Sequence, residues 1–206
     1  MSAVTAQAVK ELRDKTGAGM MECKQALTEA NGDMEKAIEY LRKKGIKDAD
    51  KKASRETKEG AIGHYIHSNM KIGVLLEVTC ETDFVARGDE FQGFLKDVCM
   101  HIAAMKPLAL SREEISATIV ARERSIYENM DDVKAKPEKV RPKIIDGKMD
   151  KFFKEKCLLE QEFVKDPKIT IKELLQSKIA IIKENIVIKR FIRFELGESQ
   201  ADGAKS

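Results

Sequence analysis

Apolar residues between Thr5 and Gly45 recur every three or four positions, in three short groups. This spacing puts the apolar side chains on one face of a helix, so it predicts three short helices. The groups are Val9 and Leu12; Met20, Met21, Ala26 and Leu27; and Met34, Ala37, Ile38 and Leu41.

The residues around these groups favour the same helices. Thr5 and Asp33 are candidate N-caps, because their side-chain oxygens can accept hydrogen bonds from the first helical turn. Glycines predict the turns between the helices, and Gly45 is expected to end the third one. Residues 1–46 are therefore predicted to form a compact three-helix domain.

Residues 47–58 contain no large apolar side chain, and basic residues predominate among them. Such a stretch cannot dock tightly on a core. We expect a basic, solvated linker here.

After Gly60 the pattern changes to two short β-like runs, at residues 61–67 and 72–79. The polar residues 68–71 between them predict a turn, so the two runs form a hairpin. The β-branched run 186–194 predicts a last strand that returns to this hairpin, since a two-stranded hairpin alone is marginally stable.

Helical patterns fill the rest of the second part. The predicted helices run from residue 83 to 105 before Pro107, from Ser111 to about Met130, from a start marked by Pro137 and Pro142, and from about 170 to 183. Residues 59–198 are therefore predicted to form an α+β core, and residues 199–206 a flexible tail.

The chain has 206 residues, of which 42% are hydrophobic, enough for one core and a small additional module. Its 38 basic and 35 acidic residues nearly cancel, leaving a net charge of +3. A dedicated nucleic-acid binder usually carries a stronger field of one sign, so a protein partner is favoured.

Cysteine spacing and the N-terminus point to the cytoplasm. The four cysteines lie far apart, without the spacing of a zinc site or a disulfide framework, which favours reduced thiols. Lys10, Glu11 and Arg13 interrupt the N-terminus before an apolar run of signal-peptide length, and no later run approaches a membrane span.

An enzyme would need convergent polar groups, and the candidates are the histidines and the thiols. His64 and His67 are three residues apart on a predicted strand, so their side chains point to opposite faces. Cys99 and His101 are two apart on a predicted helix and do not face each other. Since common catalytic motifs are also absent from the sequence, we expect no enzyme, cofactor or resident metal.

Two stretches have features that suit a binding surface. Met20 and Met21 follow a glycine turn at a helix start, and adjacent helical residues point about 100° apart, so one can be exposed while the other is buried. The alternative is that both methionines fill the core.

The second stretch leads from a strand through Thr82 or Asp83, as an N-cap, into a helix with Phe84 in its first turn. An ordinary capped helix would bury this phenylalanine. An exposed Phe84 beside a carboxylate would instead form a wedge for an apolar crevice on a partner.

Several motifs resemble the family of translation elongation factor Ts, and the resemblance spans nearly the whole chain. They are Leu-Arg-Asp-Lys-Thr-Gly-Ala-Gly-Met-Met-Glu-Cys-Lys at residues 12–24, Gly-His-Tyr-Ile-His at 63–67, Glu-Thr-Asp-Phe-Val-Ala-Arg at 81–87, Leu-Leu-Glu-Gln at 158–161 with Phe-Val-Lys-Asp-Pro at 163–167, and Arg-Phe-Ile-Arg-Phe-Glu-Leu-Gly-Glu at 190–198.

The resemblance implies a guanine-nucleotide exchange factor that binds elongation factor Tu, loosens Mg²⁺ and GDP, and is displaced by GTP. In this family the Thr-Asp-Phe-Val stretch reaches the nucleotide side of the partner, and the N-terminal module grips its GTP-binding domain. The implied contact residues here are Thr82, Asp83, Phe84 and Val85 in the first group, Arg13, Met20, Met21 and Lys24 in the second, and His67 by similarity to an interface histidine.

The resemblance also implies a fold and an assembly. The expected fold is a ubiquitin-associated-like three-helix domain, then an α/β core with a small antiparallel sheet and a helical hairpin at about 134–164. Short members of the family pair as homodimers, and the core at 59–198 would hold the dimerisation region. Three residues depart from the family pattern: Thr79 replaces a usual Asn, Glu162 replaces a common Pro, and Pro142 interrupts a more regularly helical stretch.

Two alternatives remain open from the residues. One is a ubiquitin-associated-like module with a basic linker that binds nucleic acid or ribosomes, for which salt-sensitive RNA binding would be the sign. The other is an enzyme whose activity depends on Cys80 or His67.

Overall fold

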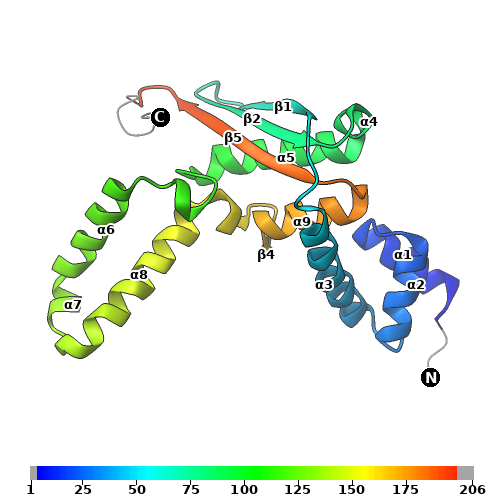
Figure 1. Ribbon diagram of the computed structural model, residues 1–206, viewed down its shortest axis with the longest axis horizontal. Helices are drawn as coiled ribbons and strands as arrows, with labels where there is room; N and C mark the ends of the chain where they lie inside the picture. Colours follow the sequence, from blue (N-terminus) through cyan, green and yellow to red (C-terminus); the bar gives the residue numbers. More distant parts are fainter. Residues whose placement is uncertain (1–3, 199–206) are drawn as a thin grey trace. The chain divides into compact units, whose positions relative to one another are not determined.

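The computed structural model describes residues 4–198, which form a mixed helix and sheet structure (Figure 1). The tail expected at 199–206 lies outside the described residues. The chain begins with three helices, α1 (Ala6–Thr16), α2 (Met20–Glu29) and α3 (Met34–Lys52). These confirm the N-terminal helices that the apolar spacing predicts.

Local capping explains where these helices begin and end. The Oγ1 atom of Thr5 accepts a hydrogen bond from the N–H of Ala8, and a carboxylate oxygen of Asp33 accepts one from the N–H of Lys36. Gly17 adopts a left-handed conformation at the end of α1, with φ of 68°. The three helices enclose a small core of Val9, Leu12, Cys23, Ala26, Leu27, Ala30 and Ala37.

The predicted end of the third helix at Gly45 is wrong, because α3 continues to Lys52. Gly45 is buried, and a Cβ atom there would lie 3.3 Å from the Cβ of Ala180 in helix α9 (Ile171–Ile182). The glycine thus lets two helices approach closely, at a helix-propensity cost of about 1 kcal/mol. Residues 47–52 are consequently helical, and Ala49 is buried rather than part of a solvated linker.

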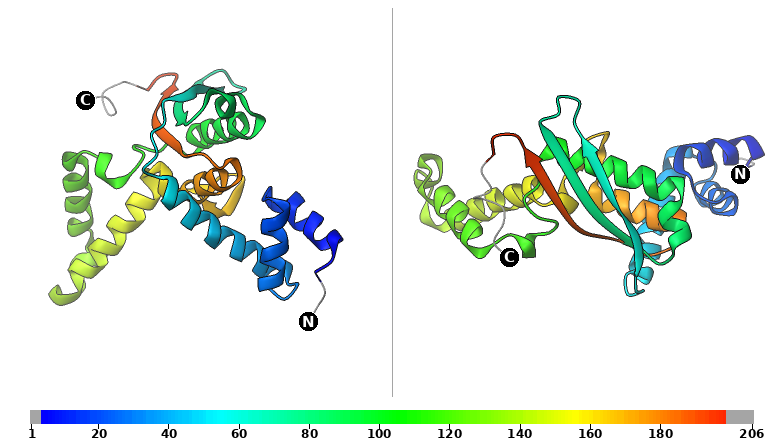
Figure 2. Two further views of the ribbon diagram at one scale, coloured as in Figure 1. Left: turned by 45° about the vertical axis from the view of Figure 1, so that its right-hand side comes forward. Right: turned by 90° about the horizontal axis from the view of Figure 1, so that it is seen from above.

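The main sheet has three strands, β1 (Glu59–Ile66), β2 (Ile72–Cys80) and β5 (Ile186–Glu195), in the order β1-β2-β5. The strands lie side by side in Figure 2. This confirms the predicted hairpin and the return of the last strand to it. Alternate residues of β2 are buried, namely Val74, Leu76, Val78 and Cys80.

The single helix predicted for residues 83–105 is two helices, α4 (Asp83–Arg87) and α5 (Asp89–Met105). Gly88 separates them with an extended backbone, φ −71° and ψ 146°. The apolar spacing continues across the break, so hydrophobic periodicity alone could not reveal it.

The helical hairpin also differs from the expected one. Its arms are α6 (Ala117–Asn129) and α8 (Arg141–Lys156), which run side by side in Figure 1 with α7 (Asp131–Lys134) near the tip. The hairpin therefore starts well before residue 134. Ser116 caps α6, whereas Ser111 begins only the short 3₁₀ helix η1 (Arg112–Glu114).

Four short elements complete the described structure. Strands β3 (Glu162–Phe163) and β4 (Asp166–Thr170) form a small antiparallel pair that the sequence pattern did not predict. Two 3₁₀ turns, η2 (Glu138–Val140) and η3 (Leu158–Glu160), flank α8. Of the family departures, Pro142 lies in the first turn of α8, where proline is tolerated, Glu162 begins β3, and Thr79 shares a 2.7 Å hydroxyl hydrogen bond with Thr57.

The described residues divide into two compact units. The first unit comprises residues 4–63, 76–96 and 173–189, and the second comprises 64–75, 97–172 and 190–198. The N-terminal helices and the Thr82 turn thus belong to the same unit. The division into functional domains at residues 46 and 58 stays a prediction.

Candidate partner-binding site

Phe84 lies in the first turn of α4, and 82% of its surface is exposed. The hydroxyl oxygen of Thr82 accepts a hydrogen bond from the N–H of Val85 at 3.4 Å and caps this turn. Ala86 is buried beneath the turn, and its carbonyl accepts a 2.6 Å hydrogen bond from the side chain of Gln92. The exposed ring therefore stands on an anchored turn, and the interpretation of Phe84 as a buried core residue is wrong.

Asp83 and Val85, on either side of Phe84, are half-buried. The carboxylate of Asp83 forms an ion pair with Arg87, one helical turn further on. This carboxylate is therefore paired with a positive charge, one residue before the exposed ring in the sequence.

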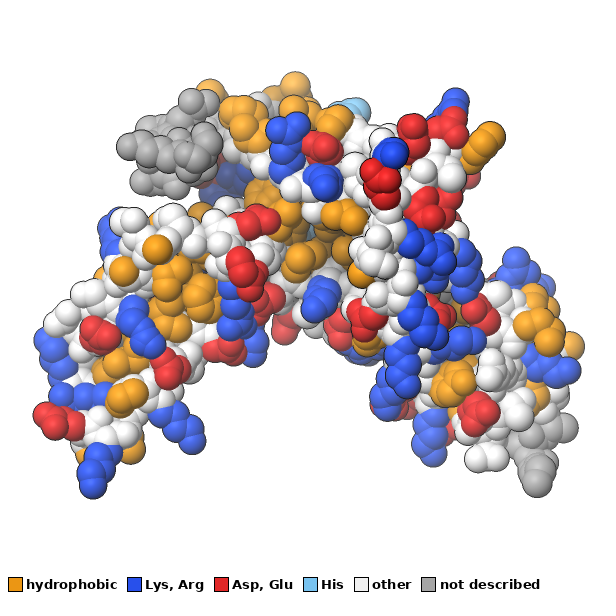
Figure 3. All heavy atoms as spheres, viewed as in Figure 1, with side chains coloured by type: hydrophobic (Ala, Val, Ile, Leu, Met, Phe, Trp, Pro, Cys, Tyr) orange, Lys and Arg blue, Asp and Glu red, His pale blue; other side chains and the backbone are white. Residues whose placement is uncertain are grey.

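The start of α2 carries a second exposed apolar pair. Met20 is 47% exposed and Met21 is 76% exposed, so neither methionine is core filler. Arg13 and Lys24 are also exposed, on α1 and α2. In Figure 3 hydrophobic side chains lie at the surface over the first two helices.

A carboxylate fixes the backbone at the start of α2. Oε2 of Glu22 accepts a hydrogen bond from the N–H of Gly19 at 3.2 Å, as in a capping box. Its Oε1 atom lies 2.7 Å from Nζ of Lys183. Burial would raise the pKa of Glu22, but the hydrogen bonds from Lys183 and Gly19 outweigh it, so this pKa lies below its ordinary value.

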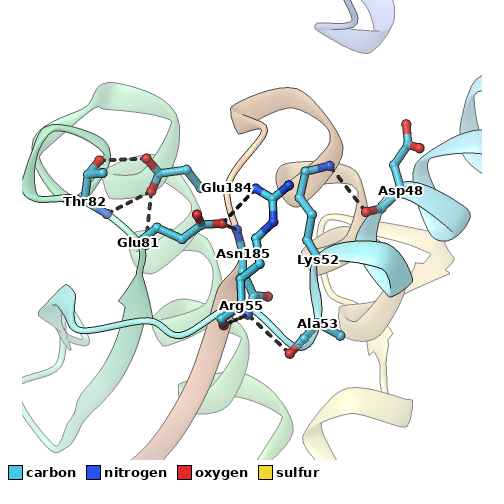
Figure 4. A network of polar contacts seen from close by, with 8 residues as sticks. All are labelled: Asp48, Lys52, Ala53, Arg55, Glu81, Thr82, Glu184 and Asn185. Carbon is cyan, nitrogen blue, oxygen red and sulfur yellow. Dashed lines mark hydrogen bonds and ion pairs between the residues drawn. The ribbon is translucent and has the colours of Figure 1, made fainter.

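A second carboxylate, that of Glu184, holds the start of α4 (Figure 4). Its Oε2 atom accepts hydrogen bonds from the backbone N–H of Glu81 at 3.1 Å and of Thr82 at 3.0 Å. Its Oε1 atom accepts one from the hydroxyl of Thr82 at 2.7 Å. One anionic group thus receives three donors from the turn that presents Phe84.

Asn185 connects the same turn to the residues that follow α3 (Figure 4). Its backbone N–H donates to the Glu81 carboxylate at 2.6 Å. Its buried side-chain amide donates to the carbonyl oxygens of Arg55 at 2.8 Å and Ala53 at 3.5 Å. The segment after α3 is therefore tied to the start of β5.

Residues 183–185 are a part of the site that the sequence pattern did not predict. In the sequence, Lys183, Glu184 and Asn185 form an ordinary polar turn between an amphipathic helix and a strand. Their partners are about 100 or more residues away in the sequence; Thr82 and Glu184, for example, are separated by 102 positions. Only the fold brings them together.

His67 belongs to the second unit, where its Nδ1 atom lies 3.1 Å from the hydroxyl oxygen of Tyr65. Within residues 4–198, no three or more His, Cys, Asp or Glu side chains are arranged to hold a metal ion. Burial raises the pKa of Cys80 to about 11 and that of Cys99 to about 12, so both thiols stay protonated and weakly nucleophilic at neutral pH. In the same part of the chain, no helix has both the length and the apolar character needed to cross a bilayer.

Fold and site together define a class of protein. A scaffold of helices and a sheet presents exposed apolar side chains at two helix starts whose backbone is fixed by hydrogen bonds, as partner-binding proteins do. Comparison with known sequences identifies the family. The profile described as Elongation factor TS matches residues 2–198. The chain belongs to the elongation factor Ts family and is a translation elongation factor.

Relatives match over almost their full lengths. Elongation factor Ts of Thermoanaerobacter sp. (strain X514) is 55% identical over 195 residues, covering 95% of this chain and 96% of the relative. The protein of the same name from Acetivibrio thermocellus is 56% identical, covering 95% and 91%. That from Solidesulfovibrio magneticus is 54% identical over 198 residues, covering 96% and 99%.

Proposed function

We propose that this protein is a guanine-nucleotide exchange factor for elongation factor Tu. It binds the GDP-bound partner in the cytoplasm, loosens Mg²⁺ and GDP, and is displaced when GTP binds. The observation that carries this proposal is the 82% exposed ring of Phe84 on an anchored turn. Leaving a phenylalanine in water forgoes about 2 to 3 kcal/mol of burial energy, which a partner surface can recover.

Exchange of this kind follows from thermodynamic linkage and needs no covalent chemistry. A factor that binds the nucleotide-free partner more tightly than the GDP-bound partner must lower the affinity for GDP by the same ratio. The factor binds before GDP leaves, and GTP then shifts the equilibrium back and releases it.

Each candidate residue has a role in this proposal. Phe84 enters an apolar crevice near the magnesium site of elongation factor Tu, while Asp83 brings a negative charge towards the metal and its water ligands. Thr82 caps the turn and Val85 adds apolar contact beside the ring. The assignment is supported by the exposure of Phe84 and by the half-buried positions of Asp83 and Val85.

Binding strength comes mainly from the N-terminal helices in this proposal. Met20 and Met21 provide adaptable apolar contact, and Arg13 and Lys24 add exposed positive charge. His67 adds a contact from the second unit. Met21, at 76% exposure, is the side chain whose truncation most directly tests this binding role.

Substitution of Phe84 by alanine separates the two roles. Phe84→Ala should retain most of the affinity for elongation factor Tu but slow GDP release at saturating factor by at least tenfold, since each 1.4 kcal/mol is about tenfold. The matched control is Leu108→Ala, which truncates another exposed apolar residue of 50% exposure. Unchanged GDP release by Phe84→Ala, measured by stopped-flow with a fluorescent GDP analogue, would refute the wedge assignment.

We also propose that the protein forms a homodimer through the exposed apolar face of its sheet in the second unit. On this face Ile66, Leu75, Ile192 and Phe194 are between 47% and 54% exposed. A Cβ at Gly73 would lie 3.2 Å from the side chain of Ile66, so the glycine leaves room for that side chain on this face. A continuous apolar sheet face of this kind is typical of a surface that is covered in the assembled protein.

Charge introduction tests the dimer. Ile192→Glu should shift the sedimentation coefficient from that of a dimer to that of a monomer. Ile126→Glu on α6, where the isoleucine is equally exposed at 47%, should leave it unchanged. A monomeric wild-type protein at micromolar concentration, or an equal effect of both variants, would contradict the proposed interface.

A further inference from the structure

The turn between α9 and β5 bonds to residues at the starts of the two helices that carry the exposed Met21 and Phe84. Lys183 and Glu184 are adjacent in the sequence, yet they bond to residues at the starts of different helices. Nζ of Lys183 lies 2.7 Å from Glu22, whose other carboxylate oxygen holds the start of α2. Glu184 accepts three hydrogen bonds from Glu81 and Thr82 at the start of α4.

We propose that Lys183 and Glu184 are positioning residues that hold the Met21 and Phe84 sites at one fixed spacing, so that both engage a single partner surface. This inference rests on the proposed exchange function. Neither residue needs to touch the partner, because each acts through the helix start that it holds.

The bonding pattern at Glu184 is more than ordinary helix capping. Thr82 already caps α4 through its own hydroxyl. The additional carboxylate binds the same hydroxyl and two consecutive backbone N–H groups, and so fixes the orientation of the turn against β5. Hydrogen bonds to an ionised acceptor are about twice as strong as neutral ones, so removal of the charge should loosen this turn.

Lys183 has a distinctive backbone as well as an ion pair. Its φ of 70° is left-handed, which is uncommon for a residue with a side chain. The carboxylate of Glu22 also lies 3.8 Å from Nζ of Lys44 in α3. Lys183 therefore joins the end of α9 to a charge cluster between two of the N-terminal helices.

Asn185 extends the same connection to the chain between the N-terminal helices and β1. Its backbone N–H binds Glu81, and its side chain binds the carbonyl oxygens after α3. These bonds are independent of the Glu184 side chain. A substitution of Glu184 can thus loosen the Phe84 turn without releasing the N-terminal helices.

The first test is Glu184→Gln, which keeps the shape of the side chain and removes its charge. GDP release from elongation factor Tu at saturating factor should slow about tenfold, while the affinity for the partner changes less than threefold. The effect should nearly disappear in a Phe84→Ala background, because the two residues act as one unit. Glu114→Gln is the matched control, since Glu114 also accepts a backbone N–H, that of Leu110 at 3.0 Å, in the second unit.

The second test is Lys183→Gln, combined with Met21→Ala. Here the affinity for elongation factor Tu should fall about tenfold, and the two substitutions should again be non-additive. Lys165→Gln is the matched control, because Lys165 has the same 51% side-chain exposure and also forms a 2.6 Å ion pair, with Asp97. Equal effects of Lys183→Gln and its control would overturn the positioning role of Lys183.

Backbone hydrogen exchange provides a readout that does not depend on the partner. In Glu184→Gln, amide exchange at Glu81 and Thr82 should accelerate about tenfold, while exchange in α6 and α8 stays unchanged. If the wild-type protein does not accelerate GDP release from elongation factor Tu, but Glu184→Gln still speeds amide exchange at Glu81 and Thr82, the nucleotide-exchange function is wrong and the local role of Glu184 at this turn remains. If the wild-type protein accelerates GDP release, but the effects of Glu184→Gln and Phe84→Ala on that rate are additive, the positioning role is wrong.

A poorly folded Glu184→Gln protein would not end the test. Thr82→Val removes the hydroxyl donor from the other side of the 2.7 Å contact and keeps the side-chain volume. It should slow GDP release by a similar factor, again without additivity to Phe84→Ala. Release at the wild-type rate would overturn the proposal.

Discussion

His101 in α5 is fully buried, and its environment makes stability depend on pH in a specific way. The N–H of Val164 donates to Nδ1 at 3.2 Å, so the ring proton is on Nε2 and donates to Oε1 of Gln161 at 2.9 Å. Burial lowers the pKa of His101, and the hydrogen bond with Gln161 opposes this only in part.

The sign of the effect follows from proton binding. Because the pKa is lower in the folded state, the unfolded chain takes up the proton first as the pH falls below about 6.5. The stabilising contribution is complete above that pH and is lost as the pH falls towards the folded-state pKa. For one such group the slope reaches about 1.4 kcal/mol per pH unit, so up to about 1.4 kcal/mol is lost between pH 7.5 and 5.5.

The assay is urea unfolding followed by circular dichroism at pH 7.5, 6.5 and 5.5, at one protein concentration. His101→Gln, which cannot titrate, should be less stable than the wild type at pH 7.5. The gap between the two free energies of unfolding should narrow by about 1 kcal/mol at pH 5.5, because only the wild type loses the histidine contribution. A gap that stays constant over this range would show that His101 does not cause the pH dependence, since the other titrating groups are common to both proteins.

Three further predictions concern stability and reactivity. Gly60→Ala should destabilise the protein by at least about 3 kcal/mol in urea unfolding, because φ is 152° and a Cβ would lie 2.2 Å from the carbonyl oxygen of Val78. The control is Gly147→Ala in α8, where a Cβ would meet nothing within 4 Å, and this variant should be as stable as the wild type or more stable. Similar losses of stability in both variants would contradict this prediction. Asn185→Ala should cost about 1 to 3 kcal/mol by the same method, since two carbonyl acceptors lose their donor, and a loss under 0.5 kcal/mol would count against that role. All four cysteines are buried, so a thiol reagent such as DTNB should react slowly with the native protein and should rapidly modify four thiols per chain after unfolding. A fast reaction with the native protein would show that a thiol is exposed.

Local sequence signals predicted the elements that local chemistry determines. Thr5 and Asp33 were recognisable as N-caps because a side-chain oxygen at a helix start has one main use, and both make the expected hydrogen bond. The hairpin and the returning strand followed from alternating and β-branched residues, and the sheet order β1-β2-β5 agrees with them.

Tertiary packing decided the features that the pattern missed. Glycine commonly ends a helix, but Gly45 lies inside α3, where its close approach to Ala180 explains the absence of a side chain. The sequence pattern starts one helix at Ser111, but Ser111 begins only a short 3₁₀ turn and Ser116 caps the long helix. Similarly, Gly88 breaks a helix whose apolar spacing continues without interruption.

The candidate site divides in the same way. The motif around Phe84 could be identified from the sequence, but its exposure could not, because a capped helix usually buries its aromatic residue. Lys183 and Glu184 carried no signal at all, since their contacts with Glu22 and Thr82 join segments far apart in the chain.

The proposed exchange function is tested first by the dissociation rate of a fluorescent GDP analogue from elongation factor Tu, measured with and without this protein. We expect strong acceleration that saturates with factor concentration and is largely lost with Phe84→Ala. Unaccelerated dissociation in the presence of folded wild-type protein would contradict the exchange function.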